Sequence, residues 1–158
     1  MPNQYECINL SYLESIAQGD KDIIEELITI FLDQIPEFTE GLEKSFKDKR
    51  WLDVAAIAHK AKSSVISMGM EELGNRDLKN LELVAKELHI KDIRSKDNPE
   101  TIEEREAEQL EKNLQGYDKE RQNWIKANAS PETVASIIDK FNTTIKKAEE
   151  ELKSEIKK

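Results

Sequence analysis

The sequence predicts an all-α protein, and three observations lead to this fold class. Glycine and proline are scarce, with five and four in 158 residues, so few positions interrupt a helix. Charged residues make up 36% of the chain and fill long helix-forming stretches. Within these stretches apolar residues recur at spacings of three and four, which places them on one face of an α-helix. A chain of this length can bury one sizeable core, and we expect an antiparallel four-helix bundle.

The first fifty residues predict a short helix followed by a long one. Ser11 and Glu14 form a capping-box pattern that predicts the start of the short helix, which Gly19 would end. Asp20 is a suitable N-cap for the long helix, which Pro36 is expected to kink or loosen. The predicted core residues of the long helix are Ile23, Leu27, Ile30, Phe31, Phe38 and Leu42.

The next forty residues predict two further bundle helices. One of them runs to about Met68, and Gly69 suits the left-handed position that follows a helix end. Its apolar stripe comprises Val54, Ala58, Ala61, Val65 and Met68. The following helix would bury Leu73, Leu78, Leu81, Val84, Ala85 and Leu88.

Residues 91–130 are predicted to be an insertion before the last bundle helix. The polar stretch 91–98 predicts a linker, and Asn98-Pro99 predicts the start of an inserted, highly charged helix. This helix carries a thin apolar seam of Ala107, Leu110, Leu114, Tyr117 and Trp124, and Gly116 weakens it. Ser130-Pro131 predicts the start of the last helix, whose apolar face comprises Val134, Ile137, Ile138, Phe141, Ile145, Ala148, Leu152 and Ile156. Residues 1–158 would form a single domain, with a bundle from 10–90 and 131–157 capped at one end by the short first helix.

Composition argues against several classes of function. A formal net charge of −9 argues against general nucleic-acid binding. The chain has no run of about 18 apolar residues, so we expect no membrane span. Cys7 is the single cysteine, which argues against a disulfide framework and indicates a reduced, cytoplasmic protein. His59 and His89 fall on different predicted helices without a carboxylate cluster between them, so we expect no metal site.

His59 is the candidate reactive group. It lies roughly 140° from the centre of the apolar stripe of its helix, so it should face solvent. Lys62 and Ser63, three and four residues later, lie beside it. A neutral imidazole is a nucleophile at cytoplasmic pH, and a lysine beside it can neutralise phosphoryl oxygens. The predicted catalytic residues are therefore His59, Lys62 and Ser63.

The surroundings of His59 predict a docking surface. From Lys44 to Lys62 there are six basic residues and two acidic ones, a local excess that would attract an anionic partner. Small or apolar residues near the histidine would let a partner approach closely. The expected docking residues are Leu52, Ala55, Ala56, Ile66 and Gly69. Two alternatives stay open: the lysines belong to an ordinary solvated helix junction, or a neighbouring helix buries Leu52 and Ile66.

Residues 58–64 read Ala-His-Lys-Ala-Lys-Ser-Ser and are followed by Met68-Gly69. This segment resembles the signature of histidine-containing phosphotransfer (HPt) domains, Ala-His-x-Leu-Lys-Gly-Ser with a small residue ten places after the histidine. In this resemblance His59 matches the phosphorylated histidine, Lys62 the lysine and Ser64 the small polar residue. Gly69 matches the later glycine. Ala61 replaces the usual leucine, and Ser63 replaces the usual glycine.

The resemblance implies a phosphorelay intermediate of two-component signal transduction. His59 would accept a phosphoryl group from the aspartate of a response-regulator receiver domain and pass it on. The implied partners are receiver domains and a hybrid sensor histidine kinase, and the receiver would supply Mg²⁺, so we expect no cofactor here. No Gly-x-x-x-x-Gly-Lys-Ser/Thr loop or Gly-x-Gly-x-x-Gly turn is present, so we expect no ATP-binding or kinase domain and a protein that is not itself an enzyme. We also expect it to be a monomer. The alternative is a non-catalytic helical adaptor or scaffold, in which the inserted helix is a docking arm and His59 is incidental.

Overall fold

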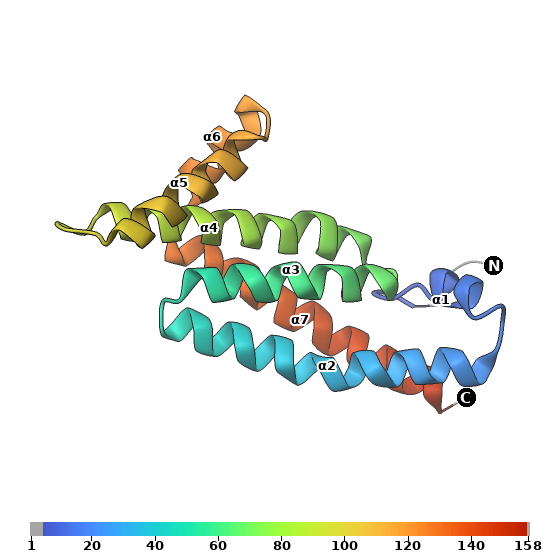
Figure 1. The fold of residues 1–158 in the computed structure, drawn as a ribbon. Coiled ribbons are helices and arrows are strands. Elements are labelled where there is room, and N and C mark those ends of the chain that lie inside the picture. The colour runs from blue at the N-terminus through green and yellow to red at the C-terminus, as the bar shows by residue number, and fades with distance from the viewer. Residues whose placement is uncertain (1–4, 158) are drawn as a thin grey trace.

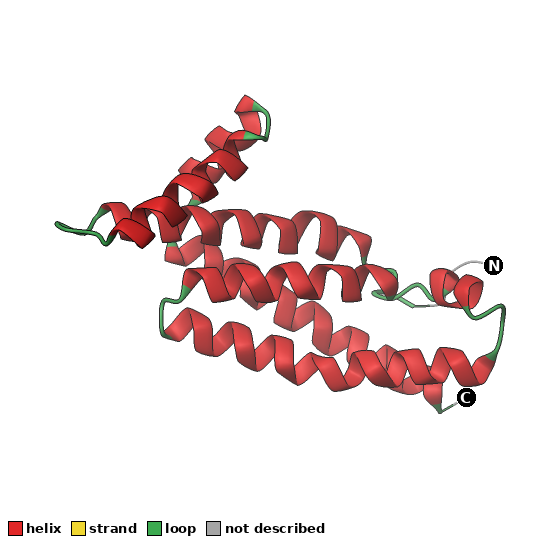
Figure 2. Ribbon diagram, in the orientation of Figure 1, coloured by secondary structure: helices red, strands yellow, loops and turns green. Residues whose placement is uncertain are grey.

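A computed structural model describes residues 5–157, so residues 1–4 and 158 of the predicted 1–158 domain lie outside the described range. Within this range the chain forms seven α-helices and one π-helical segment, without a strand (Figure 2). They are α1 (Ser11–Ile16), α2 (Lys21–Lys47), α3 (Trp51–Ser67), the π-helical η1 (Leu73–Leu78), α4 (Lys79–Arg94), α5 (Thr101–Gln115), α6 (Lys119–Asn128) and α7 (Pro131–Ile156). The predicted all-α class is confirmed. None of these described helices is both long and apolar enough to cross a bilayer.

Four long helices form the body of the protein. α3 packs between α2 and α4, and α7 packs against both α2 and α4 (Figure 1). The chain reverses direction from α2 to α3 and again from α3 to α4, and α7 runs back across the other side (Figure 1). The short α1 lies beside the start of α2. The segment before α1 contacts the end of α3, because the backbone N–H of Asn9 donates to the carbonyl of Met68 (2.9 Å).

The apolar stripe predicted for α3 is confirmed as part of the core. All five of its residues are at most 4% exposed: Val54, Ala58, Ala61, Val65 and Met68. The six apolar residues predicted for the following helix are also buried, in η1 and α4. The predicted face of α7 packs on the same core, with Ile137 and Ile156 at its edge.

The buried face of α2 differs from the prediction. Ile23 and Ile30 are 43% and 49% exposed, so their assignment to the core is wrong. The buried apolar residues of α2 are instead Ile28, Phe31, Ile35, Phe38 and Leu42. These five follow one another at spacings of three and four, so they form a single helical stripe, whereas Ile23 and Ile30 lie to one side of it.

Some predicted helix signals act as expected and others do not. Asp20 accepts hydrogen bonds from two backbone N–H groups at the start of α2, and Ser130 accepts one at the start of α7. Ser11 is already the first residue of α1 and makes no cap, so the predicted capping box is wrong. α2 is continuous through the exposed Pro36. Gly69, with φ +87°, follows the end of α3 in the left-handed conformation, as predicted.

The insertion differs from the single helix that the sequence predicts. α4 continues to Arg94 and buries Ile93, so the predicted linker at 91–98 is reduced to residues 95–100. The next helix starts after Glu100, which forms a capping box with Glu103, and not at Asn98-Pro99. The chain then breaks at Gly116 into α5 and α6, which we call the α5–α6 hairpin. It projects from the body of the protein beside α4 (Figure 1).

The α5–α6 hairpin and α4 share a second hydrophobic core. Its buried residues are Leu83, Ile90, Ile93, Ala107, Leu114 and Ile125, with Leu110, Tyr117 and Trp124 packed against it. The predicted apolar seam therefore covers the outer face of α4 and is not free to dock a partner helix. Ion pairs add to this contact: Arg94 forms a bidentate pair with Glu111 (2.5 and 2.6 Å), and His89 pairs with Glu106.

Candidate functional site

His59 lies on the side of α3 that faces α4, and its side chain is 68% exposed. The prediction that it faces away from the apolar stripe is therefore confirmed. Its Nδ1 atom lies 3.2 Å from Oε1 of Glu82 on α4, at hydrogen-bonding distance. One ring nitrogen is thus held by the protein, while most of the imidazole stays open to solvent.

Glu82 is a buried carboxylate held from two sides. Its side chain is only 6% exposed, and Nζ of Lys86 donates to its Oε2 atom (2.9 Å). Burial by itself would raise the pKa of Glu82, but the hydrogen bonds from Lys86 and His59 and the charges of Lys86 and Lys79 outweigh it and lower this pKa. Glu82 is therefore ionised at neutral pH.

The charge of Glu82 fixes the tautomer of His59. An ionised carboxylate only accepts hydrogen bonds, so Nδ1 of His59 must carry the proton in this contact. In the neutral imidazole Nε2 then bears the free lone pair. The geometry therefore leaves Nε2 as the nucleophilic atom of an exposed histidine.

Glu82 and Lys86 are not among the residues that the sequence predicts for the site, although the sequence holds one signal for Glu82. Glu82 follows Leu78 by four residues and precedes Ala85 by three, so it interrupts an apolar stripe at a core position. A carboxylate at such a position is rarely buried without a partner. The identity of that partner depends on how α3 and α4 pack, which spacing within one helix does not show.

The other two predicted catalytic residues lie beside His59 as their spacing requires. Lys62 is half-buried, and it forms no ion pair within residues 5–157. Lys60, in contrast, is neutralised by Glu37 of α2 (2.6 Å). Ser63 is exposed. Lys62 is thus a cation close to His59 without a fixed counter-ion in the described chain.

The predicted docking residues are placed unequally. Ala56 is exposed, and Leu52 and Ile66 are half-buried. Ala55 is only 3% exposed, so its assignment to the docking surface is wrong because it packs in the core. Gly69 lies about 15 Å from His59 along the helix axis. A Cβ atom at Gly69 would lie 2.4 Å from the backbone oxygen of Asn9, so this glycine is needed for packing against the N-terminal segment.

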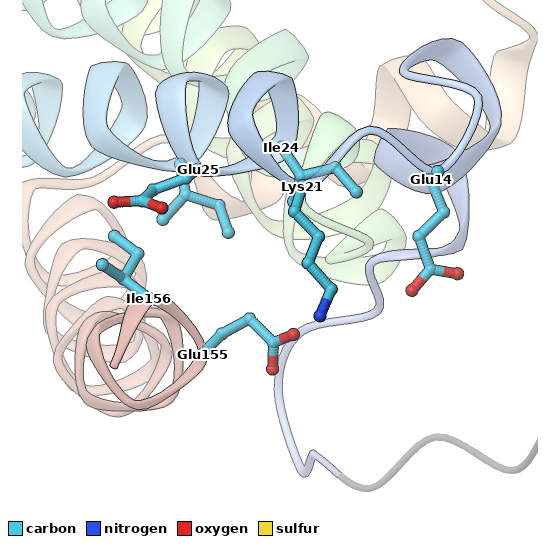
Figure 3. A pocket seen from close by; sticks show the side chains of 8 residues that line it. Glu14, Lys21, Ile24, Glu25, Glu155 and Ile156 are labelled. Atoms are coloured by element: carbon cyan, nitrogen blue, oxygen red, sulfur yellow. The ribbon is translucent and has the colours of Figure 1, made fainter. Parts of the chain in front are cut away.

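A pocket of about 380 Å³ lies elsewhere, where the start of α2 approaches the end of α7. Ile24 and Ile156 line it together with the charged side chains of Glu14, Lys21 and Glu155 (Figure 3). The residues of α2 that line it lie roughly 20 Å along the helix from the level of His59. In the described part of the chain no three His, Cys, Asp or Glu residues are grouped so as to hold a metal ion.

Comparison of the chain with protein-family models, with curated proteins and with solved structures found no match.

Proposed function

We propose that the protein is an HPt-like phosphorelay intermediate in which His59 accepts a phosphoryl group from a receiver-domain aspartate and passes it to another receiver. The observation that carries this proposal is the geometry of His59. Its ring is 68% exposed, and its Nδ1 atom is hydrogen-bonded to a buried, ionised glutamate. This arrangement leaves Nε2 free to react with a group on another protein.

The transfer needs no proton to move. The lone pair of Nε2 attacks phosphorus, the bond from phosphorus to the aspartyl oxygen breaks, and the leaving group departs as a carboxylate. The imidazole keeps its proton on Nδ1 and becomes positively charged. The negative charge of Glu82, 3.2 Å from Nδ1, stabilises this developing charge. The reverse reaction returns the phosphoryl group to a second receiver by the same path.

Lys62 and Ser63 support the step in this proposal. The positive charge of the Lys62 ammonium offsets the negative charge of the phosphoryl oxygens in the transition state. Ser63 has a small side chain, so it leaves room for the partner above Nε2. The receiver supplies the Mg²⁺ and the acid–base groups, and a hybrid sensor histidine kinase supplies the phosphoryl group in a cytoplasmic two-component pathway.

The proposed docking surface extends from α3 onto α2. Gln34 and Glu37 of α2 contact Ser64 and Lys60 of α3. Ile30 lies one turn before Gln34 on the same face and is 49% exposed. Ala56 and Ser63 of α3 are also exposed and are small. We propose that α2, α3, α4 and α7 form an antiparallel four-helix bundle of the HPt kind that presents this surface.

Incubation with a receiver carrying a labelled aspartyl phosphate tests the proposal. We expect a label on this protein that is labile in acid and stable in alkali, as a phosphoramidate bond is. His59→Gln should remove the label. The chain offers a matched control, because His89→Gln changes the other histidine, which pairs with Glu106 away from the site, and should leave labelling unchanged. Equal labelling of His59→Gln and wild type would refute the proposal.

Glu82→Gln tests the chemical role of the buried carboxylate. A glutamine can still accept a hydrogen bond from Nδ1 but carries no charge to stabilise the imidazolium. We expect phosphotransfer to slow on the order of 10-fold to 100-fold while binding of the receiver changes little. An unchanged rate would show that Glu82 only contributes to folding.

A further inference from the structure

The α5–α6 hairpin approaches the side of α4 on which Glu82 lies. Lys79, Glu82 and Lys86 follow one another at spacings of three and four, so they form a single row along α4. Glu82 contacts His59 from the middle of this row, and Lys86 contacts Glu82. The charge of Lys79 also contributes to lowering the pKa of Glu82, which places Lys79 near the carboxylate.

The turn of the hairpin meets the end of this row. Nζ of Lys79 lies 5.3 Å from the ring centroid of Tyr117, within the range of a cation–π contact. Tyr117 lies at the hairpin turn, one residue before Asp118, the N-cap of α6, and it packs against the second core. Among residues 5–157, Lys79 has no carboxylate within ion-pair distance. The Lys79–Tyr117 corner is therefore a positively charged, partly aromatic edge beside the His59 site.

A partner docked on His59 through an interface of ordinary size would reach this corner. A stable interface covers about 800 Å² on each partner, which corresponds to a disc of roughly 16 Å radius. Adjacent packed helices lie about 8 to 10 Å apart, and Lys79 lies about 4.5 Å from Glu82 along the axis of α4. A disc centred on His59 therefore contains Lys79, and its rim falls near Tyr117.

We infer that the Lys79–Tyr117 corner is a second contact for the receiver domain docked on His59, and that it selects receivers with an acidic side chain at the facing position. The inference rests on the proposed phosphotransfer function. Contacts at the rim of an interface change partner choice and association rate more than they change the reaction at its centre. The insertion thus gives the protein a means of choosing its partners that leaves the reacting atoms unchanged.

Phosphotransfer to a panel of receivers, compared with direct labelling by the small phosphoryl donor phosphoramidate, tests this inference. The variants are Lys79→Ala, Tyr117→Ala and Tyr117→Phe, which keeps the aromatic ring. Lys112→Ala is the matched control, because Lys112 is exposed on the same hairpin and points away from α4. Circular dichroism confirms that each variant is folded, and Lys79→Ala keeps the test valid if Tyr117→Ala loosens the hairpin.

We expect phosphoramidate, which needs no docking surface, to label Tyr117→Ala, Tyr117→Phe and Lys112→Ala as it labels wild type. Its rate with Lys79→Ala measures the effect of Lys79 on Glu82, and the receiver rates of this variant are divided by it. Rates with some receivers should fall about 3-fold to 10-fold in Lys79→Ala and Tyr117→Ala, whereas other receivers are unaffected. Lys112→Ala should match wild type with every receiver, and Tyr117→Phe should stay close to it. Equal rates for Lys79→Ala and wild type across the panel would overturn the inference and leave the proposed function intact. Failure of His59 to react with phosphoramidate and with every receiver would overturn both.

Discussion

Two leucines on α4 provide a matched test of how the α5–α6 hairpin is held. Leu81 is fully buried in the core formed with α2, α3 and α7, and Leu83 is fully buried in the second core under the hairpin. The two residues share one helix, one residue type and the same exposure. Leu81→Ala and Leu83→Ala therefore differ only in which core loses its contacts.

The expected cost of each replacement follows from the atoms removed. Leucine to alanine removes three carbon atoms from the core, a transfer free energy of about 2.4 kcal/mol. The space left behind adds up to about 2 kcal/mol if the surroundings do not relax. We expect a loss of roughly 2.5 to 4.5 kcal/mol in each case, which accelerates amide exchange through the affected opening by about 10² to 10³.

Hydrogen exchange followed by mass spectrometry distinguishes the two cores. Leu83→Ala should speed exchange in the peptides of residues 101–128 and leave α2, α3 and α7 nearly as protected as in wild type. Leu81→Ala should speed exchange in all helices, because it weakens the body on which the hairpin rests. The same exchange pattern in both variants would show that the protein opens as one unit and that the hairpin is not a separately cooperative part.

Three further predictions concern other residues of α4 and η1. Burial raises the pKa of the Glu87 carboxyl, so the folded state loses stability as the pH rises through this raised pKa. Glu87→Gln should therefore be more stable than wild type at pH 7. In urea titrations this difference should vanish below about pH 4. The pKa of Glu82 is lowered instead, so its stabilising effect is present above about pH 4.3 and is lost in acid. Glu82→Gln should therefore be less stable than wild type at pH 7, and the two proteins should become equally stable in acid. A Cβ atom at Gly74 would lie 2.6 Å from Cγ1 of Ile66, so Gly74→Ala should lower the free energy of unfolding by about 1 to 3 kcal/mol, and no change in the urea midpoint would contradict this close packing.

The long helices could be predicted because their determinants are local. Apolar spacing located α3, α4 and α7, and Asp20 and Ser130 act as caps through backbone groups two or three residues away. The error in α2 has a physical origin. α2 carries more isoleucines than one face can bury. Only Ile28 and Ile35 lie three or four residues from Phe31 and Phe38, and this spacing is what distinguishes them from the exposed Ile23 and Ile30.

The insertion was harder to predict because its structure depends on contacts outside it. The sequence predicts that Gly116 weakens one long helix, whereas α5 and α6 are two separate helices that both pack on α4. The apolar residues of α4 that receive them, Leu83 and Ile90, extend its hydrophobic surface beyond the stripe that faces α3. A helix that is apolar on two sides indicates two packing partners, and this feature could have been read from the sequence.

The candidate site depends on the packing register of α3 against η1 and α4, which a single-helix pattern does not contain. Ile66 and Lys62 of α3 lie so close to Gly74 that no side chain fits between them. His59 precedes Ile66 by seven residues in α3, and Glu82 follows Gly74 by eight residues. In antiparallel helices these two shifts are nearly equal, so the close approach at Gly74 sets the level at which the carboxylate meets the imidazole. A glycine in η1 thus contributes to the geometry of His59 without touching it.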